Sequence, residues 1–261
     1  MLDLEVQLLS LLAAVAVMAA TWILDLMAKD ASLADVAWGL CFVAIAAACV
    51  VSGPAVADRS TLILALVAVW GLRLAAYIGW RHDGEDRRYA AMRRKHGRRF
   101  ALRSLWSVFG LQALAAWVVS APIQVAAADP SPAQVGALGV VGALVCLSAI
   151  AYESVADLQL RRFLARADSA RAVMDEGLWG LSRHPNYFGD ACFWWGIWLV
   201  ALESGSAWWT AVGPALMTFL LLRVSGVALT EQTITSRRPG YRAYVERTSA
   251  FVPRPRRPPP P

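Results

Sequence analysis

The feature that most constrains this chain is a series of long apolar blocks, each close to the length that crosses a membrane. A transmembrane helix needs roughly 20 apolar residues to span a hydrocarbon core about 30 Å thick. Apolar residues make up 58% of the 261 residues, charged residues only 17%, and the mean hydropathy is +0.48. We therefore predict an all-α, polytopic integral membrane protein of seven helices, at 5–24, 34–52, 61–80, 104–126, 134–157, 187–203 and 208–230.

The two ends of the chain lead to separate expectations. The first block has an acidic flank, Asp3 and Glu5, and no basic segment before it, so it does not resemble a cleavable signal peptide. We expect it to remain as the first helix of a single domain over residues 1–252. The Pro/Arg-rich tail 253–261 is expected to be disordered.

The basic residues predict an orientation. Nine Lys and Arg lie in 81–103, five in 158–185 and seven after Glu231, whereas Arg59 is the only one in the three opposite loops. Since basic loops face the cytosol, we expect an outside N-terminus and a cytosolic C-terminus. The net charge of +6 then reflects topology, and we expect no nucleic-acid partner. Heavy use of Ala and Arg favours a bacterial inner membrane.

The cysteines give no sign of a metal site. Cys41, Cys49, Cys146 and Cys192 lie in apolar blocks and form no C-x-x-C pair. We therefore expect neither a zinc site nor a disulfide framework.

Polar side chains inside membrane helices are costly and often mark a site. In the block 61–80, Arg73 and Tyr77 lie one turn apart on one face. Glu153, Asp157 and Arg161 follow at i, i+4 and i+8 near the end of the fifth block. Arg73 has an alternative explanation, which is that its side chain snorkels to the headgroups. For Asp157 and Arg161 the alternative is a simple ion pair between them. The two carboxylates otherwise suit a polar ligand such as ribose hydroxyls or an amide.

The segment 177–190 is the densest group of polar and aromatic residues. Pro185 is favourable in the first turn of a helix, so a helix should start there. Its free N–H groups, with Arg183 and His184, would then suit a phosphate or carboxylate. Asn186 and Asp190 follow one turn apart and should point into the helix bundle. Tyr187 lies between them.

The C-terminal region adds a short helix. Tyr241 and Tyr244 would share one face of this helix, after Arg238 and a Pro-Gly turn. It is either an amphipathic helix at the membrane surface or a cover over a nucleotide. The glycines of 136–142 do not match a G-x-G-x-x-G motif and favour close helix packing instead.

These segments together resemble a known family, the DUF1295 membrane proteins of the steroid 5-alpha-reductase-like superfamily. The similarity extends over most of the chain from Asp35 onward. It is carried by Trp70-Gly71-x-Arg73-Leu74…Tyr77, Glu153…Ala156-Asp157…Gln159, Leu178-Trp179…Ser182-Arg183-His184-Pro185-Asn186-Tyr187-Phe188-Gly189-Asp190 and Arg238-Pro239…Tyr241…Tyr244…Thr248-Ser249…Phe251…Pro253.

The resemblance implies a seven-helix enzyme that holds NADPH in a cytosol-facing cavity without a Rossmann fold. It also implies that the polar residues above bind the cofactor. These are Arg73, Tyr77, Glu153, Asp157, Arg161, Arg183, His184, Asn186, Tyr187, Asp190, Arg238, Tyr241 and Tyr244.

The substrate site departs from that of the steroid reductases. Their Gln-Glu pair is absent, the second block opens with Asp35, and Trp70 takes the place of their tyrosine. We therefore expect reduction of a C=C bond in a hydrophobic, membrane-soluble substrate, with Asp35 and Tyr77 as the catalytic candidates.

Two other functions remain open. The run Arg183-His184-Pro185-x-Tyr187-x-Gly189, with the later Glu231, is also similar to isoprenylcysteine carboxyl methyltransferases, which bind S-adenosylmethionine. A non-catalytic membrane protein that retains a degenerate nucleotide pocket is the third possibility, because a fold does not guarantee chemistry.

Overall fold

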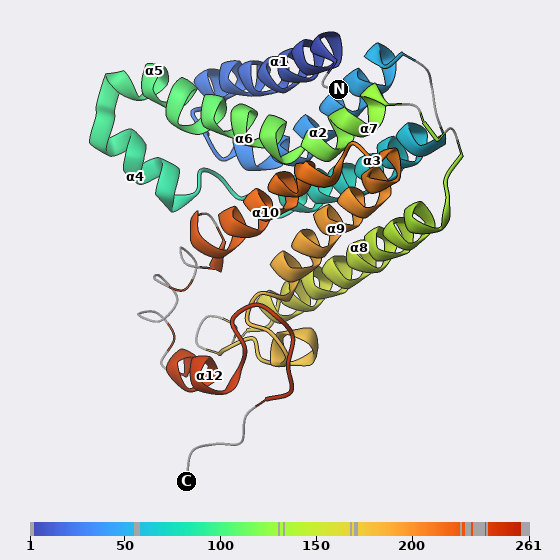
Figure 1. The fold of residues 1–261 in the computed structure, drawn as a ribbon. Coiled ribbons are helices and arrows are strands. Elements are labelled where there is room, and N and C mark those ends of the chain that lie inside the picture. The colour runs from blue at the N-terminus through green and yellow to red at the C-terminus, as the bar shows by residue number, and fades with distance from the viewer. Residues whose placement is uncertain are drawn as a thin grey trace. The chain divides into compact units, whose positions relative to one another are not determined.

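The structure is a computed structural model that describes residues 3–54, 58–129, 131–132, 134–167, 169, 172–224, 226–227, 231, 238 and 240–256. Regular structure in these ranges is helical (Figure 1), apart from an isolated parallel bridge between Ser182 and Ser249. The chain divides into two compact units. The first is Met1–Ala143 with Ile197–Gly213, and the second is Leu144–Gly196 with Pro214–Pro261. The predicted all-α class is confirmed.

The first unit is centred on three long helices. Asp3 accepts hydrogen bonds from the N–H groups of Glu5 and Val6 and so caps the first helix, and Lys29, directly after the helix, adopts the left-handed conformation. The second helix packs between the first and the third. The helices of this unit are α1 (Leu4–Ala28), α2 (Leu33–Ser52), α3 (Asp58–Trp80), α4 (Arg87–His96), α5 (Phe100–Ser104), α6 (Leu111–Val119) and α7 (Ala121–Ala128).

The second unit contains most of two neighbouring helices, α8 (Ala137–Leu164) and α9 (Pro185–Ala201). The thiol of Cys146 on α8 donates to the carbonyl of Phe193 on α9 at 3.5 Å. Helix α8 continues two turns beyond the predicted end at 157. Later helical segments of the described chain include α10 (Val212–Phe219), a π-helical turn (Leu220–Val224) and α12 (Tyr241–Arg247).

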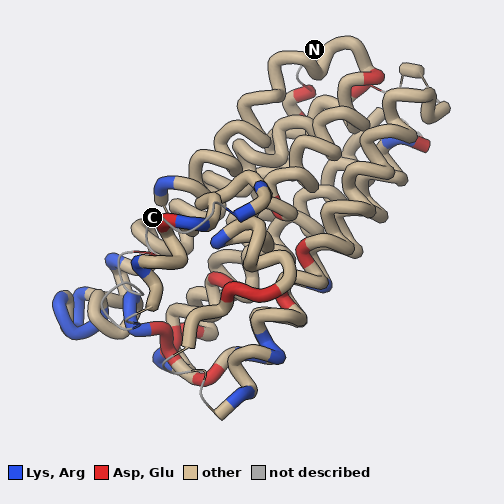
Figure 2. The backbone as a smooth tube through the Cα atoms, turned by 90° about the horizontal axis from the view of Figure 1, so that it is seen from below, with Lys and Arg blue, Asp and Glu red and all other residues tan. Residues whose placement is uncertain are grey.

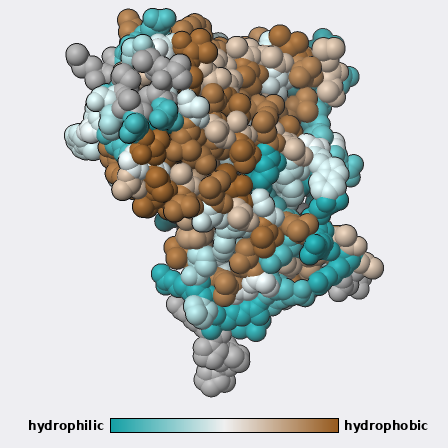
Figure 3. Space-filling view, turned by 90° about the vertical axis from the view of Figure 1, so that its right-hand side faces the viewer, coloured by the Kyte–Doolittle hydropathy of each residue, from teal (hydrophilic) through white to brown (hydrophobic). Residues whose placement is uncertain are grey.

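Among the described residues, five helical stretches are long and apolar enough to cross a membrane. Their outward side chains are large and apolar, such as Leu12, Val69 and Leu144, each more than half exposed. Figure 3 shows hydrophobic residues, in brown, over much of one face, as expected for contact with lipid. The chain is therefore an integral membrane protein. The five stretches are Leu4–Ala28, Leu33–Ser52, Asp58–Trp80, Arg87–Val119 and Ala137–Leu164.

The fourth predicted block, 104–126, is not one helix. The chain is helical through α5, a π-helical turn (Leu105–Gly110) and α6, and it bends at Ser120 before α7. Pro122 explains the bend, because its ring has no N–H and clashes with the carbonyl four residues earlier. Near the bend, Gln124 Nε2 donates to the carbonyl of Trp117 at 2.7 Å.

The end of the seventh block and the tail are described only in part. Residues 228–230 of that block lie outside the described residues, as do 257–261 of the tail, which was expected to be disordered. Residues 253–256 are described, and two of them form hydrogen bonds. Arg254 N–H donates to Leu181 O at 2.9 Å, and Arg256 Nε donates to Gly180 O at 3.2 Å.

The glycines at the start of the fifth block make room for a side chain, and not for the close packing of another helix. A Cβ at Gly136 or Gly139 would lie 2.8 or 2.6 Å from a carboxylate oxygen of Glu203. The Gly139 N–H donates to that carboxylate at 2.7 Å. Glu203 thus satisfies a free N–H in the first turn of α8, which the spacing of the glycines did not predict.

Helices α2 and α3 cross at two glycines. A Cβ built on Gly39 would lie 2.4 Å from the carbonyl oxygen of Gly71, which is backbone and cannot move aside. We expect Gly39→Ala to destabilise the protein by about 1–3 kcal/mol through overpacking. Thermal unfolding in detergent measures the loss.

Gly79→Ala is the matched control on α3. Its nearest neighbour outside the helix would be Val36 Cγ1 at 3.6 Å, an ordinary contact. The control should be neutral or slightly stabilising, because Ala favours a helix over Gly by about 1 kcal/mol. Equal stability of Gly39→Ala and Gly79→Ala would contradict the close crossing.

Candidate functional site

The second unit gathers polar side chains where α9 begins. A short 3₁₀ turn (Gly177–Gly180) precedes this point, and Pro185 is the first residue of α9, as predicted. Ser182 Oγ accepts from the His184 N–H at 3.1 Å and donates to the carbonyl of Phe251 at 2.7 Å. The Arg183 N–H donates to Ser249 O at 2.8 Å, so the C-terminal segment holds this turn in place.

Arg183 and His184 converge on one carboxylate, that of Glu231. Arg183 donates through Nε at 2.7 Å and Nη2 at 3.1 Å, and His184 Nε2 lies 3.1 Å from the same carboxylate. Arg183 is 9% exposed and His184 3%. The two residues predicted to meet an anionic ligand are thus already paired with an anion of the chain.

The pKa of Glu231 reflects this pairing. Burial alone raises its pKa, but hydrogen bonds and charge from His184 and Arg183 outweigh burial and lower it to about 2. A lowered pKa means that the ionised form stabilises the fold. That contribution is fully present above the ordinary pKa near 4.5 and is lost as the pH falls toward 2.

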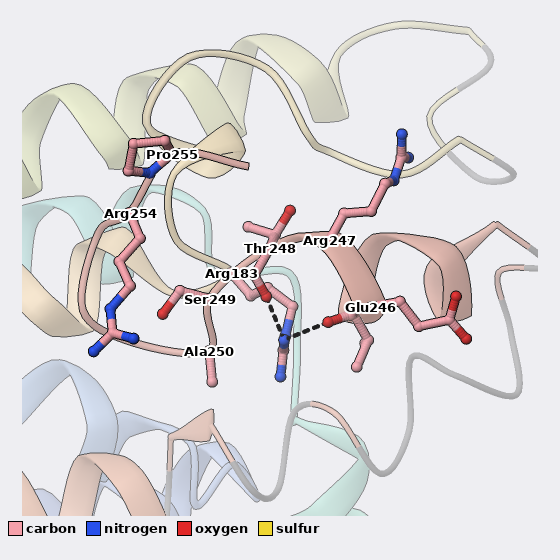
Figure 4. Close-up of a pocket in the computed structure, with 9 residues that line it drawn as sticks. Arg183, Glu246, Arg247, Thr248, Ser249, Ala250, Arg254 and Pro255 are labelled. Carbon is pink, nitrogen blue, oxygen red and sulfur yellow. Dashed lines mark hydrogen bonds between the residues drawn. The ribbon is translucent and has the colours of Figure 1, made fainter. Parts of the chain in front are cut away.

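A polar cavity of about 290 Å³ lies beside Arg183 (Figure 4). Arg183 Nη1 donates to the carbonyls of Thr248 at 2.6 Å and Val245 at 3.1 Å. The buried hydroxyl of Thr248 has no hydrogen-bond partner among the described residues. The cavity is lined by Arg183, Val245, Glu246, Arg247, Thr248, Ser249, Ala250, Arg254 and Pro255.

A second polar group lies between α8 and α9. Glu153 and Asp157 are each 3% exposed and Asp190 is 6% exposed. Asn186 Nδ2 donates to Asp157 Oδ1 at 3.3 Å, so these two residues face each other. The buried Oδ1 of Asn186 has no hydrogen-bond partner within the described residues, so an acceptor remains available there.

A glycine permits the close approach of these two helices. A Cβ at Gly189 would lie 2.9 Å from the Cβ of Glu153 and 3.2 Å from the carbonyl oxygen of Ala149. Tyr187, one turn into α9, stacks on His184 with ring centroids 5.6 Å apart and planes 8° apart. The first turns of α9 therefore contact both the Glu231 ion pair and the group of buried carboxylates on α8 and α9.

Helix α12 packs by its two tyrosines, as its spacing predicted. Tyr241 and Tyr244 are 4% and 3% exposed, and their rings are 5.6 Å apart. The Tyr244 hydroxyl donates to the carbonyl of Trp179. Burial, with the charge of Glu231, raises the pKa of Tyr241 to about 12, so its hydroxyl stays protonated at neutral pH.

Two of the predicted site residues lie away from these groups. Arg238 Nη1 donates to the carbonyl of Ala172 at 2.7 Å, and its guanidinium lies over the ring of Phe163 at 5.6 Å. Arg161 is exposed, although it follows Glu153 and Asp157 at helical spacing. The predicted three-residue stripe is therefore buried only at its two carboxylates.

The other three candidates belong to the first unit. Asp35 accepts from the Tyr89 hydroxyl at 2.9 Å and from Arg88 Nη2 at 3.2 Å. Tyr77 lies under the guanidinium of Arg81, with 5.3 Å from that carbon to the ring centroid. Arg73 is half-buried, one turn earlier on α3.

Sequence reasoning missed several partners of the site. In the sequence, Glu231 stands out only as part of a motif and not as the partner of Arg183. Gln159 Oε1 accepts from the Leu178 N–H at 2.9 Å, and Trp179 Nε1 donates to Ala156 O at 3.0 Å. The one available signal was that Glu231 is a carboxylate directly after an apolar block.

Comparison with known proteins identifies the chain by family. No curated protein and no solved structure gives a significant match. In the part of the chain that the structure describes, no group of three or more His, Cys, Asp and Glu side chains is placed to hold a metal ion. Residues 21–248 match the family described as "Protein of unknown function (DUF1295)", and the chain therefore belongs to the DUF1295 family.

Proposed function

We propose that this protein is an NADPH-dependent reductase of a C=C bond in a lipid or steroid-like substrate dissolved in the membrane. The observation that carries the proposal is the polar group between α8 and α9, where the buried Oδ1 of Asn186 has no hydrogen-bond partner among the described residues. A buried acceptor is costly in a membrane protein unless it meets a donor, and ribose hydroxyls and the nicotinamide amide are donors.

The residues fit a nucleotide in two respects. The buried Oδ1 of Asn186 offers an acceptor beside Asp157, where Asn186 is already held by its amide nitrogen. The cavity beside Arg183 has arginine side chains and the unpartnered hydroxyl of Thr248, which suit an anionic group. When bound, NADPH would supply the hydride.

The chain itself must supply the proton or polarise a substrate carbonyl. Asp35 and Tyr77 remain the candidates. The Tyr89 hydroxyl and Arg88 fix the orientation of the Asp35 carboxyl group, whose side chain is 33% exposed. Asp35→Asn and Tyr77→Phe test this role: consumption of NADPH with candidate enones at the wild-type rate would remove both from the mechanism.

We also propose how many times the chain crosses the membrane and which side its ends face. The aromatic α9 and the apolar stretch Trp208–Val224 join the five long helices to make seven spans. The basic segment 81–103 and the C-terminus are then cytosolic under the positive-inside rule, and in a bacterium the membrane is the inner one.

An S-adenosylmethionine-dependent methyltransferase is the second candidate. It is favoured by one observation, the convergence of Arg183 and His184 on Glu231, because those three residues carry the similarity to isoprenylcysteine carboxyl methyltransferases. A non-catalytic membrane protein would be supported if neither nucleotide binds.

Ligand-dependent thermal stability of the detergent-purified protein separates these functions. NADPH at 100 times its dissociation constant should stabilise the wild type by about 2.7 kcal/mol, with S-adenosylmethionine tested in parallel. Asp157→Ala and Asn186→Ala should abolish the NADPH effect, because they remove the acceptors on α8 and α9.

Ser154→Ala is the matched control. Its hydroxyl donates at 2.7 Å to the carbonyl of Ile150 on the same helix and takes no part in the carboxylate group. The control should keep the full NADPH shift. Stabilisation by S-adenosylmethionine in place of NADPH would move the protein to the methyltransferase branch.

A further inference from the structure

The segment between α3 and α6 contains a short, strongly basic helix that the proposed reaction does not use. Helix α4 is about 15 Å long, and no acidic residue occurs from Arg87 to Arg103. Figure 2 shows Lys and Arg, in blue, concentrated along this stretch. From the sequence alone, this stretch is predicted to be a loop whose arginines only set the membrane topology.

One face of α4 is fixed to the first unit. Tyr89 is 8% exposed and donates to Asp35, and Arg93, one turn later, reaches the fully buried Asp25 at 2.6 Å and Glu85 at 2.8 Å. The guanidinium of Arg93 also lies 4.4 Å from the ring centroid of Phe100. These contacts orient the helix about its own axis.

The two acidic residues directly before α4 are already engaged. Glu85 binds Arg93 through both oxygens and accepts from the Ala31 N–H at 3.1 Å. Asp86 caps α4 and pairs with Arg88 at 2.8 Å. They therefore do not neutralise the opposite face of the segment.

Five exposed basic residues lie on α4 and on the 3₁₀ turn (Gly97–Arg99) that follows it, and they are here called the basic face of α4: Arg87, Arg94, Lys95, Arg98 and Arg99. Within the described residues, none of them forms an ion pair or a side-chain hydrogen bond. Five uncompensated positive charges within about three turns create a strong local field that attracts anions.

The position of this face limits what the anions can be. Helix α3 ends at Trp80, which is 61% exposed, and Leu102 and Trp106, after the basic face, are 68% and 76% exposed. Exposed tryptophans at the ends of membrane spans typically lie at headgroup level. The basic face is tied to both spans, so it lies next to the lipid phosphates.

We propose that the basic face of α4 is a docking surface for anionic phospholipid headgroups. Attraction to an anionic leaflet strengthens binding about five-fold for each Lys or Arg near the surface. The buried contacts of Tyr89 and Arg93 hold the basic residues toward the headgroups. Lipid composition would thereby act on the first unit, which contains Asp35.

The test uses the full-length protein in neutral detergent, titrated with short-chain phosphatidylglycerol or with phosphatidylcholine of equal chain length. Binding is followed by thermal stability at low salt. Phosphatidylglycerol should bind the wild type more tightly than phosphatidylcholine, and the preference should shrink at high salt, because exposed charges are screened.

Arg94→Gln with Lys95→Gln removes two charges while keeping good helix formers. This double variant should bind phosphatidylglycerol about 10- to 30-fold more weakly, with unchanged stability in detergent alone. Arg162→Gln with Arg242→Gln is the matched control, since both residues are exposed and lie outside the basic face. The control should retain wild-type affinity.

Three results would overturn the proposal. They are equal affinity for the two lipids, equal losses in the two double variants, and binding of glycerol phosphate as tight as that of phosphatidylglycerol. The last result would indicate a site for a free anion and not for a lipid surface.

Discussion

Replacing Arg183 with Met is expected to lower the stability of the protein by about 3–5 kcal/mol. The change removes the ion pair with Glu231 and leaves the carbonyls of Val245 and Thr248 without their donor. Breaking a buried ion pair from one side is costly, and the Glu231 carboxylate would lose both hydrogen bonds from Arg183 and keep only its contact with His184 among the contacts described above. Thermal unfolding in detergent, followed by circular dichroism, measures the loss.

Arg254→Met is the control for Arg183→Met. Arg254 lines the same cavity, but it is exposed, and within the described residues only its backbone N–H forms a hydrogen bond, to Leu181 O. The control should stay within about 0.5 kcal/mol of wild type. Arg183→Lys should fall between the two, because an ammonium cannot reproduce the paired hydrogen bonds of a guanidinium. Similar stability of Arg183→Met and Arg254→Met would contradict the ion pair.

Arg93→Met, in the first unit, is expected to lower the stability of the protein by a similar amount. Asp25 is fully buried near the end of α1, and Arg93 neutralises it at 2.6 Å from α4. Without Arg93, the buried carboxylate of Asp25 would lose the guanidinium that pairs with it. We expect destabilisation of about 3–5 kcal/mol, measured as above.

A second substitution tests the cause of this loss. Asp25→Leu in the Arg93→Met background should recover part of the stability, because it removes the buried charge that the first change exposed. Arg94→Met, a neighbour with an exposed side chain, should have little effect. No recovery in the double variant would mean that Arg93 acts through its packing on Phe100 and not through Asp25.

The sequence predicted the membrane class and most spans because a bilayer imposes a length and an apolar composition on each helix. It also predicted the start of α9, since Pro185 is restricted to the first turn of a helix, and the shared face of Tyr241 and Tyr244, which follows from helical spacing. These features depend only on neighbours within a few residues.

The prediction failed where a local feature interrupts a uniform pattern. The block 104–126 is apolar throughout, but Pro122 breaks it at Ser120. The charged segment 81–103 lacks an apolar pattern, yet it forms a helix because Asp86 caps it and Tyr89 and Arg93 anchor it. Arg161 has the spacing of a buried stripe but lies beyond the buried part of α8.

The sequence by itself determined which residues are polar within apolar surroundings, and so where a site could form. Only the tertiary structure decided which partners they take. Arg183 is 48 residues from Glu231 and Arg93 is 68 residues from Asp25, so no helical spacing relates them. A buried charge must find an opposite charge or a hydrogen bond in three dimensions, and chain folding alone brings that partner within 3 Å.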